Sequence, residues 1–455
     1  MLGIDTTHVS VWRKETLAEK DTTEKVVITG IGAISPLGNT SSDMWEGLCE
    51  GRCGISSITA FDPIGFSCKL AGQVDDFKIQ AVVPKSYRKA VKLMSRDIEL
   101  SIIAANEAIT DSGLITKGID PENINIDPTR IAVNIGAGLI SCDLVELAPA
   151  VAQSVSDDRF DIRKWGREGL ELVTPLWLLK YLPNMLACHI GIIHDIQGPS
   201  NTITCAETSG HLAISEAAQI IARGDSDIAL AGGAEAKVNP IVMIRQCLLK
   251  RAISGYNHQP DTACRPFDAD AKGSVFGEAA AMVVLENSEN ARGRGAKIYA
   301  QIAGVGCSNS INPSYEHLEP NDKGIRTAIE KALADAQIGP EELDLIVPHG
   351  TGIPADDLAE AGAIEAVIGD FKVPVWPTKS MLSNTGAAAG ALDVVAAVCA
   401  MNDGMIPAAK NCDTKAVGCN LNIVNRPQQK KLRYVLCCSY TYGGQTAAVV
   451  LKRND

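Results

Sequence analysis

Residues 198 to 210 read Gly198-Pro199-Ser200-Asn201-Thr202-Ile203-Thr204-Cys205-Ala206-Glu207-Thr208-Ser209-Gly210, and a helical period then runs to Gly224. The start of a helix offers the positive end of the helix dipole and exposed backbone amides, which suit a thiolate nucleophile or an oxyanion. At this position the chain carries a carboxylate, Glu207, and Cys205 lies two residues before it.

Around this segment, short β-branched runs alternate with helical periods, which is the pattern of parallel sheets covered by helices. Apolar residues repeat with helical spacing from Ile325 to Leu333, and Gly339-Pro340 ends that predicted helix. The chain is therefore predicted to adopt an α/β fold. The predicted strands are Val26–Thr29, Arg130–Ile135, Ile228–Ala231, Ala280–Leu285, Ile298–Ala303, Leu345–Val347, Tyr434–Cys438 and Ala447–Leu451.

The composition excludes several classes of protein. A hydrophobic content of 46% over 455 residues is ample for a buried core. The formal charge of −12 disfavours binding to nucleic acid or anionic lipid, and no long basic run offsets it. The cluster Arg88, Lys89, Lys92 and Arg96 is either a solvated helix face or a docking site for an acidic partner.

The location of the protein is predicted to be cytoplasmic. We find no stretch near the roughly 18 to 20 apolar residues that span a bilayer. The segment Met1–Glu24 is polar and mixed in charge, without the apolar core of a secretory signal. The 14 cysteines are scattered and lack paired CxxC spacings, so we expect reduced core residues and no metal site.

Three further groups of residues could carry chemistry. His349-Gly350-Thr351 is followed by Asp357 and Glu360, Lys379-Ser380-Met381 is followed by Asn384, and Tyr442 lies on the glycine-rich turn Thr441–Gly444. Each group alone also fits a structural role, since a single histidine in an apolar run is more often a core residue. Gly30-Ile31-Gly32 lacks the third glycine of a dinucleotide-binding fingerprint and is interpreted as part of a structural turn that continues through Ser35-Pro36-Leu37-Gly38.

Taken together, these motifs resemble the β-ketoacyl-acyl-carrier-protein synthase family of type II systems, over about residues 25 to 452. The resemblance implies a thiolase-like fold, in which two αβαβα halves pack into five layers, form dimers and hold the active site between them. The motifs that carry it are Val26–Gly38, Trp45-Glu46-Gly47-Leu48, Gly51-Arg52-Cys53-Gly54-Ile55, Ala231-Gly232-Gly233-Ala234-Glu235, Arg265-Pro266-Phe267-Asp268, His349-Gly350-Thr351, Thr378-Lys379-Ser380-Met381 and Gly443-Gly444.

In this family a cysteine is acylated from an acyl carrier protein, and two histidines assist decarboxylation and bind the enolate oxygen. The spacing between Gly198-Pro199-Ser200 and Thr208-Ser209-Gly210 equals that of the family, which places Glu207 at the nucleophile position. Cys205 would need a shift of two residues, or roughly 6–7 Å along a strand.

The resemblance assigns the other site residues in the same way. His349 matches the first histidine and Asn384 the second, while Asp357, Glu360 and Lys379 match supporting charges. Thr351 matches one pantetheine-contacting threonine and Ile353 replaces the other. Tyr442, followed by Gly443 and Gly444, matches the aromatic gate. The family geometry further implies an ion pair between Glu207 and His349.

Because a glutamate at the nucleophile position cannot form a stable thioester intermediate, two functions remain open. The first is a non-condensing subunit, similar to chain-length factors, that pairs with an active synthase and shapes its acyl tunnel. The second is an enzyme acting on acyl or malonyl carrier protein, either a decarboxylase or a condensing enzyme that uses Cys205. Either way the partners are an acyl carrier protein, which brings the phosphopantetheine arm, and a second subunit in a homodimer or heterodimer, with no nucleic acid, membrane insertion or other cofactor.

The predicted domain organisation is a polar extension over residues 1–24, an N-terminal half over 25–285 with a cap excursion at about 141–180, and a C-terminal half over 286–455.

Overall fold

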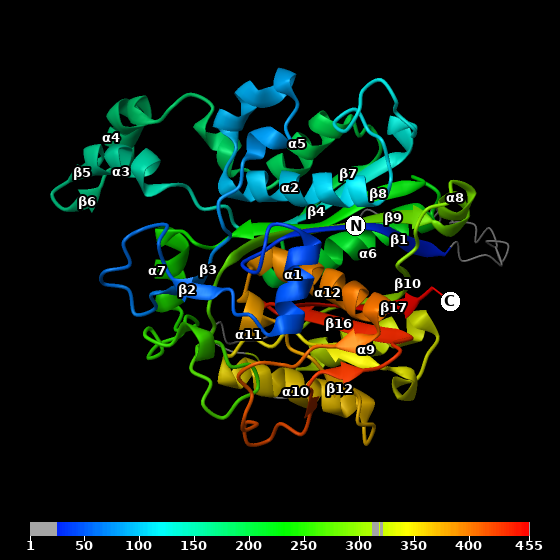
Figure 1. Ribbon diagram of the computed structural model, residues 1–455. Coiled ribbons are helices and arrows are strands. Elements are labelled where there is room, and N and C mark those ends of the chain that lie inside the picture. The colour runs from blue at the N-terminus through cyan, green and yellow to red at the C-terminus, as the bar shows by residue number, and fades with distance from the viewer. Residues whose placement is uncertain (1–24, 312–317, 319–321, 455) are drawn as a thin grey trace, which may run out of the picture.

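Eleven strands form one hydrogen-bonded ladder that folds over on itself (Figure 1). This computed structural model describes residues 25–311, 318 and 322–454. The strand order is β14-β12-β11-β16-β17-β10-β1-β9-β8-β4-β7. In the middle of this order, β1 and β10 pair only through Val26–Ile28 and Ala300–Ile302. The ladder is thus two sheets joined at one corner.

The two sheets repeat one pattern. Counted outwards from the joint between β1 and β10, the strand order of the first sheet is β1, β9, β8, β4 and β7. The corresponding order of the second sheet is β10, β17, β16, β11 and β12. In both series the first three strands are antiparallel and the last three are parallel. The main strands are β1 (Val26–Ile34), β4 (Ile131–Ala137), β7 (Ser200–Ile203), β8 (Ile228–Ala236), β9 (Glu278–Asn287), β10 (Ala300–Asn309), β11 (Leu345–Val347), β12 (Pro374–Val375), β14 (Asn422–Ile423), β16 (Tyr434–Tyr440) and β17 (Gln445–Arg453).

Helices form the other three layers (Figure 1). Helices α2 and α5 cover the outer face of the first sheet, α6 and α12 lie between the sheets, and α9 and α10 cover the second sheet. The predicted αβαβα arrangement of two pseudo-repeated halves is confirmed. The helices are α1 (Ser41–Glu50), α2 (Arg96–Asp111), α3 (Leu144–Gln153), α4 (Ile162–Lys164), α5 (Met185–His194), α6 (Ser209–Ala222), α7 (Pro240–Leu248), α8 (Ser288–Gly293), α9 (Lys323–Ala336), α10 (Pro354–Ile368), α11 (Lys379–Leu382) and α12 (Ala389–Asp403).

Each of the eight predicted strands is found, although most are longer than predicted. The prediction that Gly30-Ile31-Gly32 form part of a turn is wrong, because these residues lie inside β1. The turn begins only at Ser35, whose amide donates to the Gly38 carbonyl (2.9 Å). A Cβ on Gly32 would lie 2.2 Å from the Ala104 carbonyl oxygen, so glycine here lets α2 approach the strand closely.

The expectation that no segment is long and apolar enough to span a membrane is wrong. Residues Gly386–Asp403 form one helical stretch that is long and apolar enough to cross a membrane by length and composition. Because 83% of that stretch is buried between the sheets, it is accounted for as the central core helix of the fold.

Residues 141–180 contain α3, α4 and two short hairpin strands, β5 (Val155–Ser156) and β6 (Arg159–Phe160), which project away from the sheets in Figure 1. The boundary at residue 285 falls within β9, and the domain limits stay a prediction. The extension over residues 1–24 lies outside the described residues. Two further short strand pairs lie outside the large ladder: β2 (Ile55–Ser57) with β3 (Leu70–Gly72), and β13 (Met405–Ile406) with β15 (Gln428–Gln429).

We predict that Gly32→Ala destabilises the protein by about 1–3 kcal/mol, because the new methyl group overlaps the backbone of α2. Gly293→Ala in α8 is the matched control, since nothing lies within 4 Å of its Cβ position. Urea unfolding of both variants measures the difference. Equal midpoints for the two variants would contradict the tight packing of α2 on β1.

Candidate active site

Glu207 lies on a strained turn between β7 and α6. The turn is a single 3-10 segment, Ala206–Thr208, in which Ala206 adopts a left-handed conformation with φ of 46°. The Ser209 hydroxyl holds it closed, because it accepts from the Cys205 amide (2.8 Å) and donates to the Ala206 carbonyl (2.7 Å). This geometry turns the Glu207 side chain inward at the start of α6, where it is only 4% exposed.

The partner of Glu207 is Lys237, which sequence reasoning did not identify. Lys237 Nζ lies 3.1 Å from Glu207 Oε1 and 3.8 Å from Glu235 Oε2. Burial alone would raise the Glu207 pKa, but attraction by Lys237 and Arg251 outweighs it and lowers that pKa below its ordinary value. Burial disfavours the Lys237 ammonium, yet the two carboxylates raise its pKa. The pair is therefore ionised.

Two carboxylates shape the loop that carries His349. Glu360 accepts from the amides of His349 (2.7 Å) and Gly350 (2.8 Å), while Asp357 accepts from the Thr351 amide (2.7 Å). Burial raises the pKa of Glu360 to about 8 and that of Asp357 to about 6. The two acids thus position the loop through its backbone and do not face solvent.

His349 does not form the predicted ion pair with Glu207. Its ring packs edge-on against Tyr440, with centroids 4.8 Å apart, and its Nδ1 has no hydrogen-bond partner among the described residues. Burial, followed by repulsion from Lys379 and other nearby cationic groups, lowers the His349 pKa well below 6.5. The imidazole is neutral, and Glu207 is paired with Lys237 instead.

The second half of the chain supplies Lys379 and Asn384. Lys379 Nζ contacts Asp393 Oδ2 at 2.7 Å and is buried rather than exposed. Asn384 Oδ1 accepts from the Gly386 amide (3.1 Å), and its backbone pairs with that of Phe276. Because the Lys237 ammonium lies 5.3 Å from the Phe276 ring centroid, Asn384 belongs to the same buried neighbourhood as Glu207.

Tyr442 and Glu207 line one cavity of about 480 Å³. The Arg251 guanidinium lies 4.6 Å from the Tyr442 ring centroid and contacts Asp356 at 2.7 Å. The amides of Gly443 and Gly444 donate to the Thr441 hydroxyl (3.1 Å) and carbonyl (2.8 Å). The amides of these two glycines are thus engaged within the turn itself.

Thr351 is buried, and its hydroxyl donates to Asp357 (3.1 Å) and accepts from the Ile353 amide (3.2 Å). The structure therefore brings the predicted residues into one buried region between the halves. The residues that sequence reasoning missed are Lys237, Arg251 and His211, whose Nδ1 lies 2.7 Å from the Ser439 hydroxyl. Lys237 lies two residues after the motif Ala231-Gly232-Gly233-Ala234-Glu235, and this short spacing was the one sequence signal that could have identified it.

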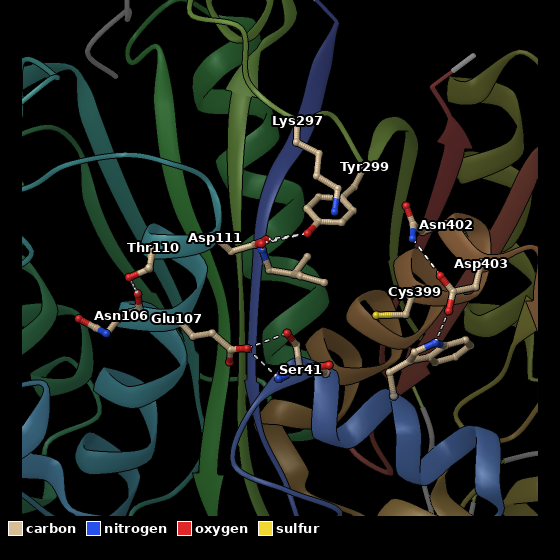
Figure 2. A pocket seen from close by; sticks show the side chains of 13 residues that line it. Ser41, Asn106, Glu107, Thr110, Asp111, Lys297, Tyr299, Cys399, Asn402 and Asp403 are labelled. Carbon is tan, nitrogen blue, oxygen red and sulfur yellow. Dashed lines mark hydrogen bonds between the residues drawn. The ribbon is translucent and has the colours of Figure 1, made fainter.

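A larger cavity of about 570 Å³ holds none of the predicted site residues (Figure 2). Glu107 accepts from the Ser41 amide (2.8 Å) and hydroxyl (2.7 Å), and Asp111 accepts from the Tyr299 hydroxyl (2.9 Å). On its far side Asp403 accepts from the Trp45 indole. Asp111 and Asp403 thus link the two halves, whereas the contact of Glu107 with Ser41 lies within the first half.

Five layers, with a buried histidine, lysine and acidic cluster between two related halves, define a ketosynthase-type protein. Residues 23–291 match the model of the β-ketoacyl synthase N-terminal domain, and residues 299–413 match that of the C-terminal domain. The chain belongs to the β-ketoacyl synthase family of fatty-acid and polyketide biosynthesis and has its thiolase-like fold.

Individual relatives agree with this assignment. The chain is 35% identical over 433 residues to 3-oxoacyl-[acyl-carrier-protein] synthase 2 of Coxiella burnetii, covering 94% of this chain and 98% of that protein. The ishigamide ketosynthase/chain length factor structure matches with a TM-score of 0.81 and 30% identity, over 95% of this chain and 100% of that one. A type II polyketide ketosynthase solved with its acyl carrier protein, AntDE:AntF, matches with a TM-score of 0.80 and 25% identity, over the same shares.

We predict that Glu207→Gln and Lys237→Met each destabilise the protein, because each leaves one buried charge without its main partner. The cost is about 3–5 kcal/mol, at the lower end for Glu207→Gln because Glu235 remains near Lys237. The double variant should cost less than the sum, with a coupling of about 1–3 kcal/mol in urea unfolding. Additive costs would show that the pair is not formed.

The same pair predicts a pH dependence. Since the folded-state pKa of Glu207 lies below its ordinary value of 4.5, its contribution is present above that pH and is lost as the pH falls through the folded-state pKa. The stability difference between the parent and Glu207→Gln should accordingly shrink on acidification below pH 4.5. Unfolding measured from pH 7 to pH 3 checks this, and a difference that grows on acidification would contradict it.

Proposed function

We propose that this chain is a non-condensing, chain-length-factor-like subunit that pairs with an active synthase and shapes its acyl tunnel. The observation that carries the proposal is the buried Glu207–Lys237 ion pair at the start of α6, at the position that the motif spacing assigns to the family's nucleophile. A carboxylate neutralised by a lysine offers no thiolate for acyl transfer.

Neither of the nearby groups restores condensing chemistry. Cys205 precedes the strained turn, and burial raises the pKa of its thiol, which disfavours the reactive thiolate. Asn384 stands at the second histidine position, and its side-chain oxygen is engaged by the Gly386 amide. These features also weigh against a decarboxylase that depends on two histidine donors.

Two surfaces support pairing with a second subunit. Strand β7 is the last strand of its sheet, and its residues Ser200 and Asn201 are exposed, so its outer edge is open to another strand. The nearby excursion exposes large apolar side chains in unusual number. They include Leu144, Val145, Phe160, Ile162, Leu170, Leu172, Leu176 and Leu178. We propose a heterodimer with a cysteine-containing synthase paralogue over a homodimer, because only such a partner supplies the missing nucleophile.

The proposed substrate carrier is an acyl carrier protein, which brings its own phosphopantetheine arm, and the proposed location is the cytoplasm. Of the basic cluster, Arg88, Lys89 and Lys92 are exposed and available to an acidic partner. Arg96 is not available in the same way, since it forms an ion pair with Glu278 at 2.9 Å. The three available cations lie on the 3-10 segment Lys85–Leu93 before α2, so the proposed docking site is smaller than the sequence suggests.

We predict that the isolated chain is not acylated when it is incubated with an acyl carrier protein thioester, because residue 207 lacks a thiol. Intact-mass measurement checks this, with Cys205→Ala as the control. A stable acyl adduct that disappears in Cys205→Ala would overturn the proposal in favour of a condensing enzyme. Release of carbon dioxide from malonyl carrier protein by the chain alone would instead support a decarboxylase.

We further predict that the chain copurifies from its host with a synthase paralogue in equal amounts. Replacing exposed apolar residues of the excursion, as in Leu172→Asp with Leu176→Asp, should abolish that complex, because a buried unpaired carboxylate opposes association. Ile311→Asp, on a different and also exposed surface, is the control. Copurification that survives the double change would place the interface elsewhere.

A further inference from the structure

The cavity beside Glu207 is lined by several charged and amide side chains, which is unusual for a space that would receive a hydrocarbon chain. Leu139 and Pro183 contribute apolar surface, but the lining also includes Glu207, Lys237, Arg245 and Gln246. Glu207 and Gln246 are 4% and 3% exposed. Buried charged and amide groups favour binding of a ligand only if the ligand forms hydrogen bonds with them.

Two acceptors in this lining are unsatisfied. Glu207 Oε2 and Gln246 Oε1 are both buried and have no hydrogen-bond partner among the described residues. The other carboxylate oxygen, Glu207 Oε1, is already bound to Lys237. A buried acceptor without a donor is costly, so these two oxygens favour a ligand that carries an O–H or N–H group.

One donor in the same lining is also available. Arg245 forms no hydrogen bond or ion pair within the part of the chain that the structure describes, although it acts electrostatically on Lys237 and Glu235. It belongs to α7, next to Gln246, and lines the same cavity. A group that donates to one of these oxygens and accepts from Arg245 would satisfy that oxygen and the guanidinium.

A hydroxyl group can do this, since its single O–H donates to one of the two oxygens while its lone pairs accept from Arg245. A ketone only accepts and an alkyl chain does neither. We propose that this cavity binds an acyl group bearing a hydroxyl substituent, and that Gln246 and Arg245 determine this preference. The inference rests on the proposed function, because it takes the cavity of the non-condensing subunit as part of the acyl tunnel.

The test uses the parent chain alone with three matched probes, the pantetheine thioesters of 3-hydroxybutyrate, 3-oxobutyrate and butyrate. Isothermal titration calorimetry should show the hydroxyacyl probe binding about tenfold or more tightly than either of the others, which corresponds to one hydrogen bond to a charged or buried partner. Butyrate or 3-oxobutyrate thioesters binding as tightly, or no probe binding at all, would overturn the proposal.

Variants assign the preference to the named residues. Gln246→Leu keeps the size of the side chain and should bring the three affinities close to one another, and Arg245→Met should reduce the hydroxyacyl preference independently. Gln219→Leu, an exposed glutamine on α6, should leave it unchanged. A preference that persists in both Gln246→Leu and Arg245→Met would overturn the assignment. Since no carrier protein or partner synthase is present, a failure here is distinct from failure of the acylation or copurification tests.

Discussion

The site depends on how closely strand β8, the first turn of α6 and the turn Gly386–Ala388 before α12 approach one another. A Cβ on Gly233 would lie 2.2 Å from the Ala387 carbonyl oxygen, and one on Gly210 would lie 2.8 Å from the same oxygen. A Cβ on Gly386, which adopts a φ of 60°, would lie 1.9 Å from Glu235 Oε2. Only glycine fits at such contacts. They bring the turn that carries Glu207 against the loop that carries Asn384.

Much of the fold could be predicted because its strands differ sharply from their surroundings. β-branched and alanine-rich runs buried on both faces, such as the one that became β9, produce continuous apolar segments. The ends of strands were harder to predict from the sequence. Gly30 and Gly32 in β1 resemble turn residues until the packing of α2 against the strand is known. The corner between β1 and β10 could not be predicted, because it depends on contacts between segments more than 270 residues apart.

For the candidate site, the sequence predicted the residues better than their contacts. The motif resemblance pointed to Glu207, His349, Lys379 and Asn384 as candidate site residues, and the structure brings them into one buried region. Spacing along a chain, however, does not show which charged groups meet. Glu207 binds Lys237, and His349 lies in a setting where burial and nearby cations favour the neutral ring. The predicted ion pair was wrong because it considered two groups where the site holds several.

The pairing of Glu207 with Lys237 also constrains how such a chain can change over generations. A single codon change to cysteine at position 207 would leave an ammonium group buried at 4% exposure, with only Glu235, 3.8 Å away, to balance it. If Lys237 were replaced first, the buried Glu207 carboxylate would lose its partner instead. Each single change therefore leaves one buried charge without its main partner, a cost that a paired change at both positions avoids. The two positions are therefore epistatic, because the residue tolerated at one depends on the residue present at the other.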